Sequence, residues 1–549
     1  MKKRFSFPGV LCVFFVCGTL YAKTLTPSHI TVTALPAFGS TNFTSDTVFL
    51  TFRCTNHTNR AVPLEISVKF GTYRNPEEHK IKKFLRLPGL ASSEVSFCHP
   101  RLGKYGNIHW EALSDSGIIV RKSGENFYSC SEIFRGIASS SFRPDVFEYL
   151  FDNIKNAPLP VKEWPVDSRA YANPALIILD SKDKIPPAVN EALRLAAARG
   201  GKILVLVMGN DPWPAGAGVE IPGVPYEEKI GFGSRVVMRT AAVDTNPRWK
   251  EFVRKKHAAG SKGKWKAQYK NLRWHEKYLV SHLAGIPPKN NVIAHPSAAL
   301  SSFSVEPPPV PLGMLTFLMC CFVVIIGPVN FLVLKKFHAE VWSLVTIPAF
   351  SLLFTGVVIG GVFFKEGFSS KGGAVVETVL DQRTSLAAAR GNFSLYSPVS
   401  VGKFYFNSDD MLNFTKSGRI DGEADSNLVF ASSLLRPRMT FDYSVSRSGY
   451  CSEKLSFSEK NGTLEVVNGL GVKVDSLYVS DGQGKFFKLG SPLEPGARAV
   501  LYAVSKLPAK VGNIAKDCYR ATTSKPFFIS PGVIPDKYEH KQTIFGRWR

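Results

Sequence analysis

Three polar residues follow two apolar stretches that read as neighbouring strands of one parallel sheet. Asp180 ends the stretch at residues 175–179, and Asn210 and Asp211 come directly after the stretch at 202–208. Ligands of open α/β sheets bind beyond the carboxyl ends of the strands, so these side chains occupy the usual place for a site. Two aspartates there can hold a metal ion or act as an acid–base pair. The alternative is that they cap the next helix.

The sequence offers no nucleophile beside these aspartates. It has no Gly-x-Ser-x-Gly or Gly-x-Cys-x-Gly turn, no phosphate-binding loop, and no cysteine between Cys130 and Cys320. His275 and His282 are seven residues apart, whereas a zinc-protease helix needs histidines at i and i+4. We therefore expect no bound metal, no cofactor and no nucleophile-dependent hydrolase or amidotransferase.

The surroundings of the aspartates predict an α/β domain over residues 132–284. A helix at 187–198 begins with a proline and ends at Gly200-Gly201, and it lies between the two strands. A strand–helix–strand unit implies a parallel sheet with helices on both faces.

Two further regions alternate in the manner of short β-strands. Residues 23–131 contain five such runs, at 30–34, 48–52, 64–70, 94–98 and 108–113. They predict a β-sandwich, with an immunoglobulin-like module as the first choice. Residues 365–549 predict a second, C-terminal β-sandwich. The fold class is therefore multidomain, α/β plus all-β.

Two charge-free segments near the middle of the chain predict a transmembrane hairpin. Residues 313–334 and 341–364 would form helices of about 33 and 36 Å, each long enough to cross a bilayer. The connection at 335–340 is short, so the helices must be antiparallel neighbours. Pro328 interrupts the first helix, and we expect Asn330 to bond to the partner helix.

The two ends of this hairpin are predicted to lie outside the cytoplasm. Residues 1–22 have the basic start and short apolar core of a secretory signal peptide. Lys335 and Lys336 place the short loop at 335–340 in the cytoplasm by the positive-inside rule. Residues 285–312 are rich in proline and predict an extended spacer between the α/β domain and the membrane.

A basic and aromatic segment at 248–277 is inserted in the α/β domain. In a cytosolic protein it would suggest nucleic acid, but export excludes that partner. Anionic lipid, an acidic surface polymer or an acidic protein remain, in keeping with a net charge of +24, and a solvated insertion without a specific role is the alternative. The candidate binding residues are Arg248, Trp249, Arg254, Lys255, Lys256, Lys262, Lys264, Trp265, Lys266 and Trp274.

Five cysteines fall in the exported regions. Cys451 and Cys518 are the two in the C-terminal region, and an oxidising compartment makes a disulfide between them a reasonable hypothesis. Cys54, Cys98 and Cys130 leave one odd thiol.

The run Gly-Pro-Val-Asn at 327–330, followed by Phe-Leu-Val-Leu-Lys-Lys, resembles a group of uncharacterised bacterial membrane-anchored proteins. In that group an exported β-domain and a class I glutamine amidotransferase-like domain precede a two-helix hairpin and a β-rich tail. Ser394-Leu395-Tyr396-Ser397-Pro398 also matches. The resemblance implies a flavodoxin-like α/β domain, non-catalytic here because the elbow cysteine is missing, in a protein of the bacterial cytoplasmic (inner) membrane.

Taken together, these features predict a non-enzymatic, membrane-anchored envelope protein that serves as a scaffold or as an accessory subunit of a protein complex or transporter. One alternative is an extracytoplasmic hydrolase that uses the strand-end aspartates with a metal or as acid and base. A second alternative is a binder of anionic lipid or surface polymer through residues 248–277.

Overall fold

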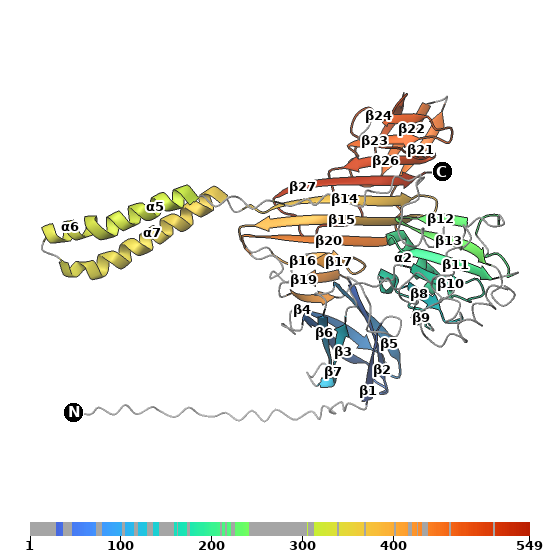
Figure 1. The fold of residues 1–549 in the computed structure, drawn as a ribbon, viewed down its shortest axis with the longest axis horizontal. Helices are drawn as coiled ribbons and strands as arrows, with labels where there is room; N and C mark the ends of the chain where they lie inside the picture. Colours follow the sequence, from blue (N-terminus) through green and yellow to red (C-terminus); the bar gives the residue numbers. More distant parts are fainter. Residues whose placement is uncertain are drawn as a thin grey trace, which may run out of the picture.

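The computed structural model is mostly β-sheet. It describes residues 29–36, 47–72, 79–100, 105–114, 119–128, 136–141, 159–161, 163–172, 176–208, 211–214, 217–220, 226–240, 305, 312–337, 340–366, 369–399, 402–414, 420–424, 427–430, 437–460, 463–508 and 511–548. In these residues the chain forms four sheets and a projecting pair of apolar helices (Figure 1).

Two sheets at the N-terminal end share one core. The smaller has the order β1-β2-β5, formed by β1 (Ile30–Pro36), β2 (Thr47–Asn56) and β5 (Ser92–Pro100). The larger contains β3 (Val62–Thr72), β4 (His79–Leu87), β6 (Tyr105–Ser114) and β7 (Ile119–Tyr128). Leu64, Ile66 and Val68 alternate along β3 and belong to one buried cluster with Phe52 of β2. Period-two alternation thus buries one face of each strand.

Strands from beyond the helix pair complete this larger sheet. Its order is β16-β19-β18-β4-β3-β6-β7, with β16 (Phe404–Asn407), β18 (Ile420–Ala424) and β19 (Asn427–Phe430). β18 pairs in parallel with β4, which places Ile420 opposite His79. The region predicted as a separate C-terminal domain therefore contributes strands and core residues to the N-terminal sheets.

A six-stranded sheet holds the strands that end in the candidate site. Its order is β12-β13-β11-β10-β8-β9, from β8 (Gly136–Ser139), β9 (Leu159–Val161), β10 (Leu176–Asp180), β11 (Lys202–Met208), β12 (Tyr226–Ile230) and β13 (Gly233–Thr240). All pairs are parallel except β12 with β13. The helix α2 (Pro187–Arg199) connects β10 to β11 and packs its apolar side on the sheet.

The turn between β12 and β13 fits closely against the end of α2. Gly231 has a positive φ of +58°, and a Cβ atom there would lie 2.4 Å from the carbonyl oxygen of Ala198. Only glycine tolerates both conditions. This contact sets the position of β13 relative to the helix.

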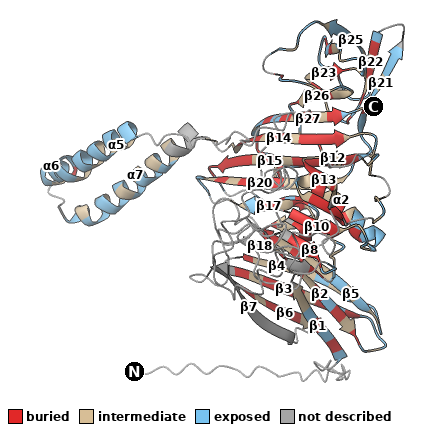
Figure 2. Cartoon of the chain, turned by 45° about the vertical axis from the view of Figure 1, so that its right-hand side comes forward, coloured by how far each residue is buried: buried red, intermediate tan, exposed pale blue. Residues whose placement is uncertain are grey.

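The largest sheet has eleven strands and forms the middle and upper part of the molecule in Figure 1, in the order β17-β20-β15-β14-β27-β26-β23-β24-β25-β22-β21. Its strands are β14 (Lys371–Asp381), β15 (Leu386–Ser397), β17 (Met411–Phe414), β20 (Met439–Tyr450), β21 (Lys454–Lys460), β22 (Thr463–Gly469), β23 (Ser476–Ser480), β24 (Phe486–Leu489), β25 (Arg498–Val504), β26 (Cys518–Thr523) and β27 (Lys537–Arg547). The long central strands are largely buried (Figure 2). Leu386 and Ala388 of β15 share a core cluster with α2, so the α/β unit packs directly on this sheet.

The helix pair consists of two long apolar helices. The first comprises α5 (Leu312–Val324), a π-helical turn (Ile325–Val329) that contains Pro328, and α6 (Asn330–Lys336); the second is α7 (Ser343–Glu366). Stretches of 25 and 19 residues in them are long and apolar enough to cross a membrane. Asn330 is 7% exposed, and its Nδ2 donates to Thr346 Oγ1 at 3.1 Å. The expected bond from Asn330 to the partner helix is therefore confirmed.

In the N-terminal region all five predicted strands are present, with two additions. The five predicted N-terminal runs lie in β1, β2, β3, β5 and β6, while β4 and β7 were not predicted. The predicted disulfide is not formed, because Cys451 and Cys518 are both free thiols. Cys451 instead contacts Glu453, and Cys518 lies on β26, which β15, β14 and β27 separate from β20. Residues 1–22, the basic segment 248–277 and most of the spacer 285–312 lie outside the described residues.

Candidate functional site

The structure places two of the three predicted site residues at the same edge of the parallel sheet. Asp180 ends β10, and Asp211 follows β11. The backbone N–H of Lys182 donates to Asp180 Oδ1 at 3.0 Å, and the Lys182 ammonium lies 3.0 Å from Asp211 Oδ1. Asn210 lies outside the described residues. One lysine therefore joins the two strand ends.

A third carboxylate, which sequence reasoning missed, organises the same turn. Asp183 Oδ2 accepts the backbone N–H of Asp180, and its Oδ1 accepts the hydroxyl of Ser139 at the end of β8, both at 2.9 Å. The helix α2 begins at Pro187, and Pro186 before it makes no side-chain cap. The aspartates therefore brace the turn between β10 and α2 and do not cap that helix.

Burial and the neighbouring charges set the pKa of Asp180. Burial raises the pKa of its carboxyl group, nearby Asp183 and Asp211 raise it further, and the N–H of Lys182 opposes the rise. In the part of the chain that the structure describes, no three His, Cys, Asp or Glu side chains converge on a position for a metal ion. The three carboxylates can bind a proton or an ammonium group, and Asp211 already pairs with the ammonium group of Lys182.

A cavity of about 630 Å³ opens beside Asp180, between α2 and strands β10 to β13. Its walls are apolar at Leu179, Ile203 and Val205. Its polar lining residues are Asp180, Ser181, Asp183, Asn190, Arg194, Glu228 and Arg235. The hydroxyl of Ser181 is buried without a hydrogen-bond partner. Residues 136–240 contain no histidine and no cysteine, so this region supplies no imidazole to activate that hydroxyl.

The loop that carries Asp211 is held by a cation. The Arg239 guanidinium donates to the Asp211 carbonyl oxygen at 2.9 Å and pairs with Glu220. It also lies over the Trp213 ring at 5.9 Å from the centroid. These contacts fix the loop, which is a structural role.

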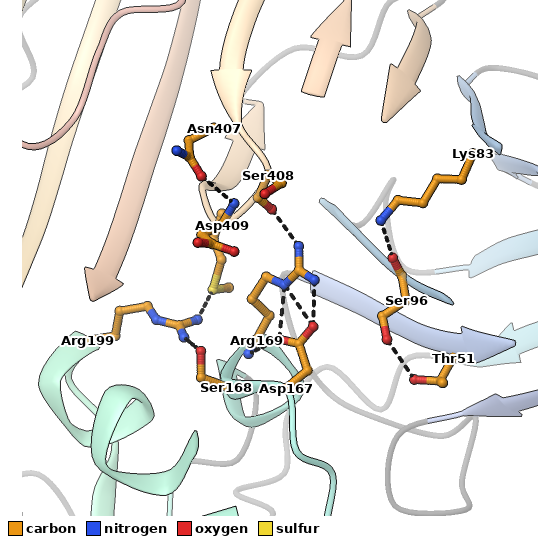
Figure 3. Close-up of polar contacts among 11 residues, drawn as sticks. Thr51, Lys83, Ser96, Asp167, Ser168, Arg169, Arg199, Asn407, Ser408 and Asp409 are labelled. Carbon is orange, nitrogen blue, oxygen red and sulfur yellow. Dashed lines mark hydrogen bonds and ion pairs between the residues drawn. The ribbon is translucent and has the colours of Figure 1, made fainter. Parts of the chain in front are cut away.

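A second polar cluster, which we call the junction, joins the α/β unit to strands from beyond the helix pair (Figure 3). Arg199, in the last turn of α2, donates to Ser448 Oγ of β20 at 2.9 Å. It also contacts Met411 and Ser168. Arg169 pairs with Asp167 and donates to the carbonyl oxygen of Ser408. Burial lowers the pKa of Arg199 to about 10, so it stays charged at neutral pH.

No local pattern in the sequence pointed to the junction. The partners of Arg199 and Arg169 at Met411, Ser408 and Ser448 lie more than 200 residues away in the chain. The role of the two arginines could be found only once the strands beyond the helix pair were placed against α2.

Comparisons with known proteins add little. No protein-family model matches the chain, and no curated protein matches it. Solved structures that resemble parts of it include the yeast delta-COP-I mu-homology domain, at 8% identity and a TM-score of 0.19, over 32% of this chain and 95% of that domain. Another is Bacteroides uniformis beta-glucuronidase 2, at 10% identity and a TM-score of 0.16, over 33% of this chain and 34% of the enzyme. Likenesses this remote assign neither a fold family nor an activity.

Proposed function

We propose that the chain is a non-enzymatic, membrane-anchored envelope protein that acts as a scaffold or as an accessory subunit of a protein complex or transporter. We call the part of the chain outside the helix pair the body. The observation that carries this proposal is that the regions before and after the helix pair share sheets and cores in the body and are joined by the junction. Such a body is suited to presenting a fixed surface at a membrane.

The candidate site supports the same proposal. The carboxylates of Asp180, Asp183 and Asp211 are engaged in bracing a turn or pairing with Lys182. Ser181 lacks an imidazole base from its own region. A hydrolytic enzyme needs a nucleophile or activated water with a base in reach.

The proposal extends to topology and domain class. Val305, before the first helix, bonds to Ser394 near the end of β15, and β14, after the second helix, begins at Lys371 opposite Tyr396 of β15. Lys335 and Lys336 lie in the last turn of α6, at the other end of the helix pair, so we place the body outside the cytoplasm and this tip inside it. The bacterial inner membrane follows from the family resemblance. The parallel strands β9-β8-β10-β11-β13 have the chain order 2-1-3-4-5 of flavodoxin-like sheets, which favours that class for the α/β unit. The two N-terminal sheets around one core favour a β-sandwich.

The experiment combines turnover with complex formation. The purified full chain in nanodiscs is assayed against amide, ester, phosphoester and glycoside substrates, and membranes extracted in mild detergent are run on native gels. We expect no turnover, and a complex larger than a dimer of the chain that is unchanged by Asp180→Ala. Turnover that Asp180→Ala abolishes would overturn the proposal.

The hydrolase alternative draws on one specific observation, the cavity beside Asp180 with its raised pKa. Metal bound stoichiometrically to the purified full chain, and lost in Asp180→Ala, would favour it. The polymer-binding alternative through residues 248–277 requires salt-sensitive binding. Changing Lys255, Lys256, Lys262 and Lys264 to Gln should then weaken binding; unchanged binding excludes this alternative.

A further inference from the structure

The two connections to the helix pair meet the body at one edge of the largest sheet. α7 ends at Glu366 and β14 begins at Lys371, so the connection spans at most about 18 Å. On the other side, the N–H of Val305 donates to Ser394 Oγ on β15 at 2.9 Å, seven residues before the start of α5. A membrane that contains the helices must therefore lie close to this edge (Figure 1).

Strand register shows which residues form the edge. Lys371 at the start of β14 lies opposite Lys537 at the start of β27 and opposite Tyr396 near the end of β15. Ser397, the last residue of β15, lies opposite Met439, the first of β20. We call this set of strand ends and their adjoining loops the juxtamembrane edge.

Large apolar side chains are exposed on the juxtamembrane edge. Ile534, in the loop before β27, is 70% exposed, and Met439 is 47% exposed. Tyr405 is 56% exposed, and its backbone N–H donates to Gly532 at 2.9 Å, which places it beside the loop of Ile534. Neighbouring apolar side chains left open at one edge mark a contact surface more often than isolated ones do.

Exposed cations accompany these apolar groups. Lys537 and Lys403 are exposed, and Lys371 is partly exposed. One carboxylate oxygen of Asp536, in the same loop, accepts two hydrogen bonds from Ser370, so this oxygen is already bonded within the protein. Aliphatic tips, a tyrosine and lysines together are the composition of surfaces that lie at the headgroup level of a bilayer.

We propose that the juxtamembrane edge rests on the phospholipid headgroup layer, with Ile534 and Met439 reaching the acyl boundary and Lys371, Lys403 and Lys537 pairing with lipid phosphate. This inference rests on the proposed insertion of the helix pair in a membrane. This contact would fix the orientation of the body relative to the membrane. The ends of the central strands would contact the bilayer, and the β21 to β25 end of the sheet would lie away from the bilayer.

The test places a photoreactive benzoylphenylalanine in the full chain in nanodiscs of phosphatidylcholine and phosphatidylglycerol. The test positions are Ile534 and Met439; Leu352 in α7 is the positive control. Val500 on β25 is the negative control, because it is 44% exposed and lies far from the juxtamembrane edge. The register places Tyr502 level with Phe545, and β25 runs parallel to β27, so Val500 is level with Thr543, six residues or about 20 Å from Lys537 along β27.

We expect phospholipid adducts, detected by mass, at Ile534 and Met439 in at least about fivefold excess over Val500, since only groups in contact with lipid crosslink to it. Adducts at Leu352 with none above the Val500 level at Ile534 and Met439 would overturn the inference alone. Absence of adducts at Leu352 would overturn the membrane insertion, and the inference with it. A protein crosslink in place of lipid at Ile534 would assign the edge to a protein partner and contradict the proposal.

A charge variant tests the phosphate contacts separately. Changing Lys371, Lys403 and Lys537 to Gln should lower the share of phosphatidylglycerol among the Ile534 adducts by about threefold, because each lysine at an anionic surface favours anionic lipid. The matched control changes three exposed lysines elsewhere, Lys485, Lys506 and Lys516, to Gln. An equal fall in both triple variants would show a net-charge effect and overturn the assignment of these three lysines.

Discussion

Asp410 is a buried carboxyl group in the turn between β16 and β17, beside the junction. It is 5% exposed, its Oδ2 accepts the backbone N–H of Asn407 at 2.9 Å, and its Oδ1 has no hydrogen-bond partner. Burial raises its pKa to about 6. In the unfolded chain the pKa is about 3.9, so between pH 4 and 6 the folded state binds the proton more tightly and stability falls as pH rises.

We therefore predict that Asp410→Asn stabilises the protein at neutral pH. The variant should have a free energy of unfolding about 1 to 3 kcal/mol higher at pH 7.5, and nearly the same value as the unaltered chain at pH 4. Denaturant unfolding of the full chain in detergent, repeated from pH 4 to 8, measures this. Asp409→Asn is the control, because Asp409 is exposed in the same turn. An unchanged slope of stability with pH in Asp410→Asn would contradict the prediction.

The residues of the candidate site show how much of a site can be predicted from the sequence. The positions of Asp180 and Asp211 followed from a general rule about strand ends, because parallel strands bring their carboxyl ends to one edge. The brace from Asp183 to Ser139 and the contacts of Arg199 did not follow, since each depends on a partner chosen by tertiary packing.

Among the elements, the helix pair offers the cleanest test. The hydrogen bond from Asn330 to Thr346 joins the two helices, and at 3.1 Å it satisfies a polar group that would otherwise face apolar surroundings. We predict a coupling energy of about 0.6 to 1.7 kcal/mol between Asn330→Leu and Thr346→Val in a double-mutant cycle. Unfolding of the detergent-solubilised chain by sodium dodecyl sulfate provides the measurement.

The control for that cycle pairs Asn330→Leu with Thr355→Val. Thr355 donates to the carbonyl oxygen of Ser351 in its own helix, at 2.8 Å, so it should show no coupling with Asn330. Equal coupling in both cycles would mean that the bond between the helices contributes nothing specific.

Local periodicity located strands better than it located their neighbours. The run at 64–70 alternates clearly and became part of β3, because one face is buried. β4 carries lysines at Lys80, Lys82 and Lys83, which obscured its alternation. The parallel pairing of β4 with β18 could not be foreseen, because residue periodicity specifies a buried face and says nothing about a partner strand beyond the helix pair.

For the whole molecule, the shared cores predict that two separate pieces of the chain can reassemble. Phe52 and Ile66 from the N-terminal region lie in one cluster with Phe393 and Phe430. We expect residues 23–305 and 369–549, produced together without the helix pair, to copurify as a soluble complex, and residues 23–305 alone to aggregate. Size-exclusion chromatography with light scattering checks both outcomes.

The pairing of β18 with β4 should be essential to that complex. Gly422→Pro removes a backbone donor from β18, opposite Ile81 of β4, and should lower the recovery of the complex several-fold. A soluble, monodisperse 23–305 piece that does not bind its counterpart would contradict the shared-core description.

The pairing of β4 with β18 can form only late in the synthesis of the chain. β4 ends at Leu87 and β18 begins at Ile420, so a ribosome that adds 5 to 20 residues per second needs roughly 20 to 70 s to deliver the missing neighbour. Throughout that interval the growing polypeptide carries a strand with one open edge, which invites association with other nascent chains. Losses during production should therefore increase when translation is slow, even though the finished molecule is well packed.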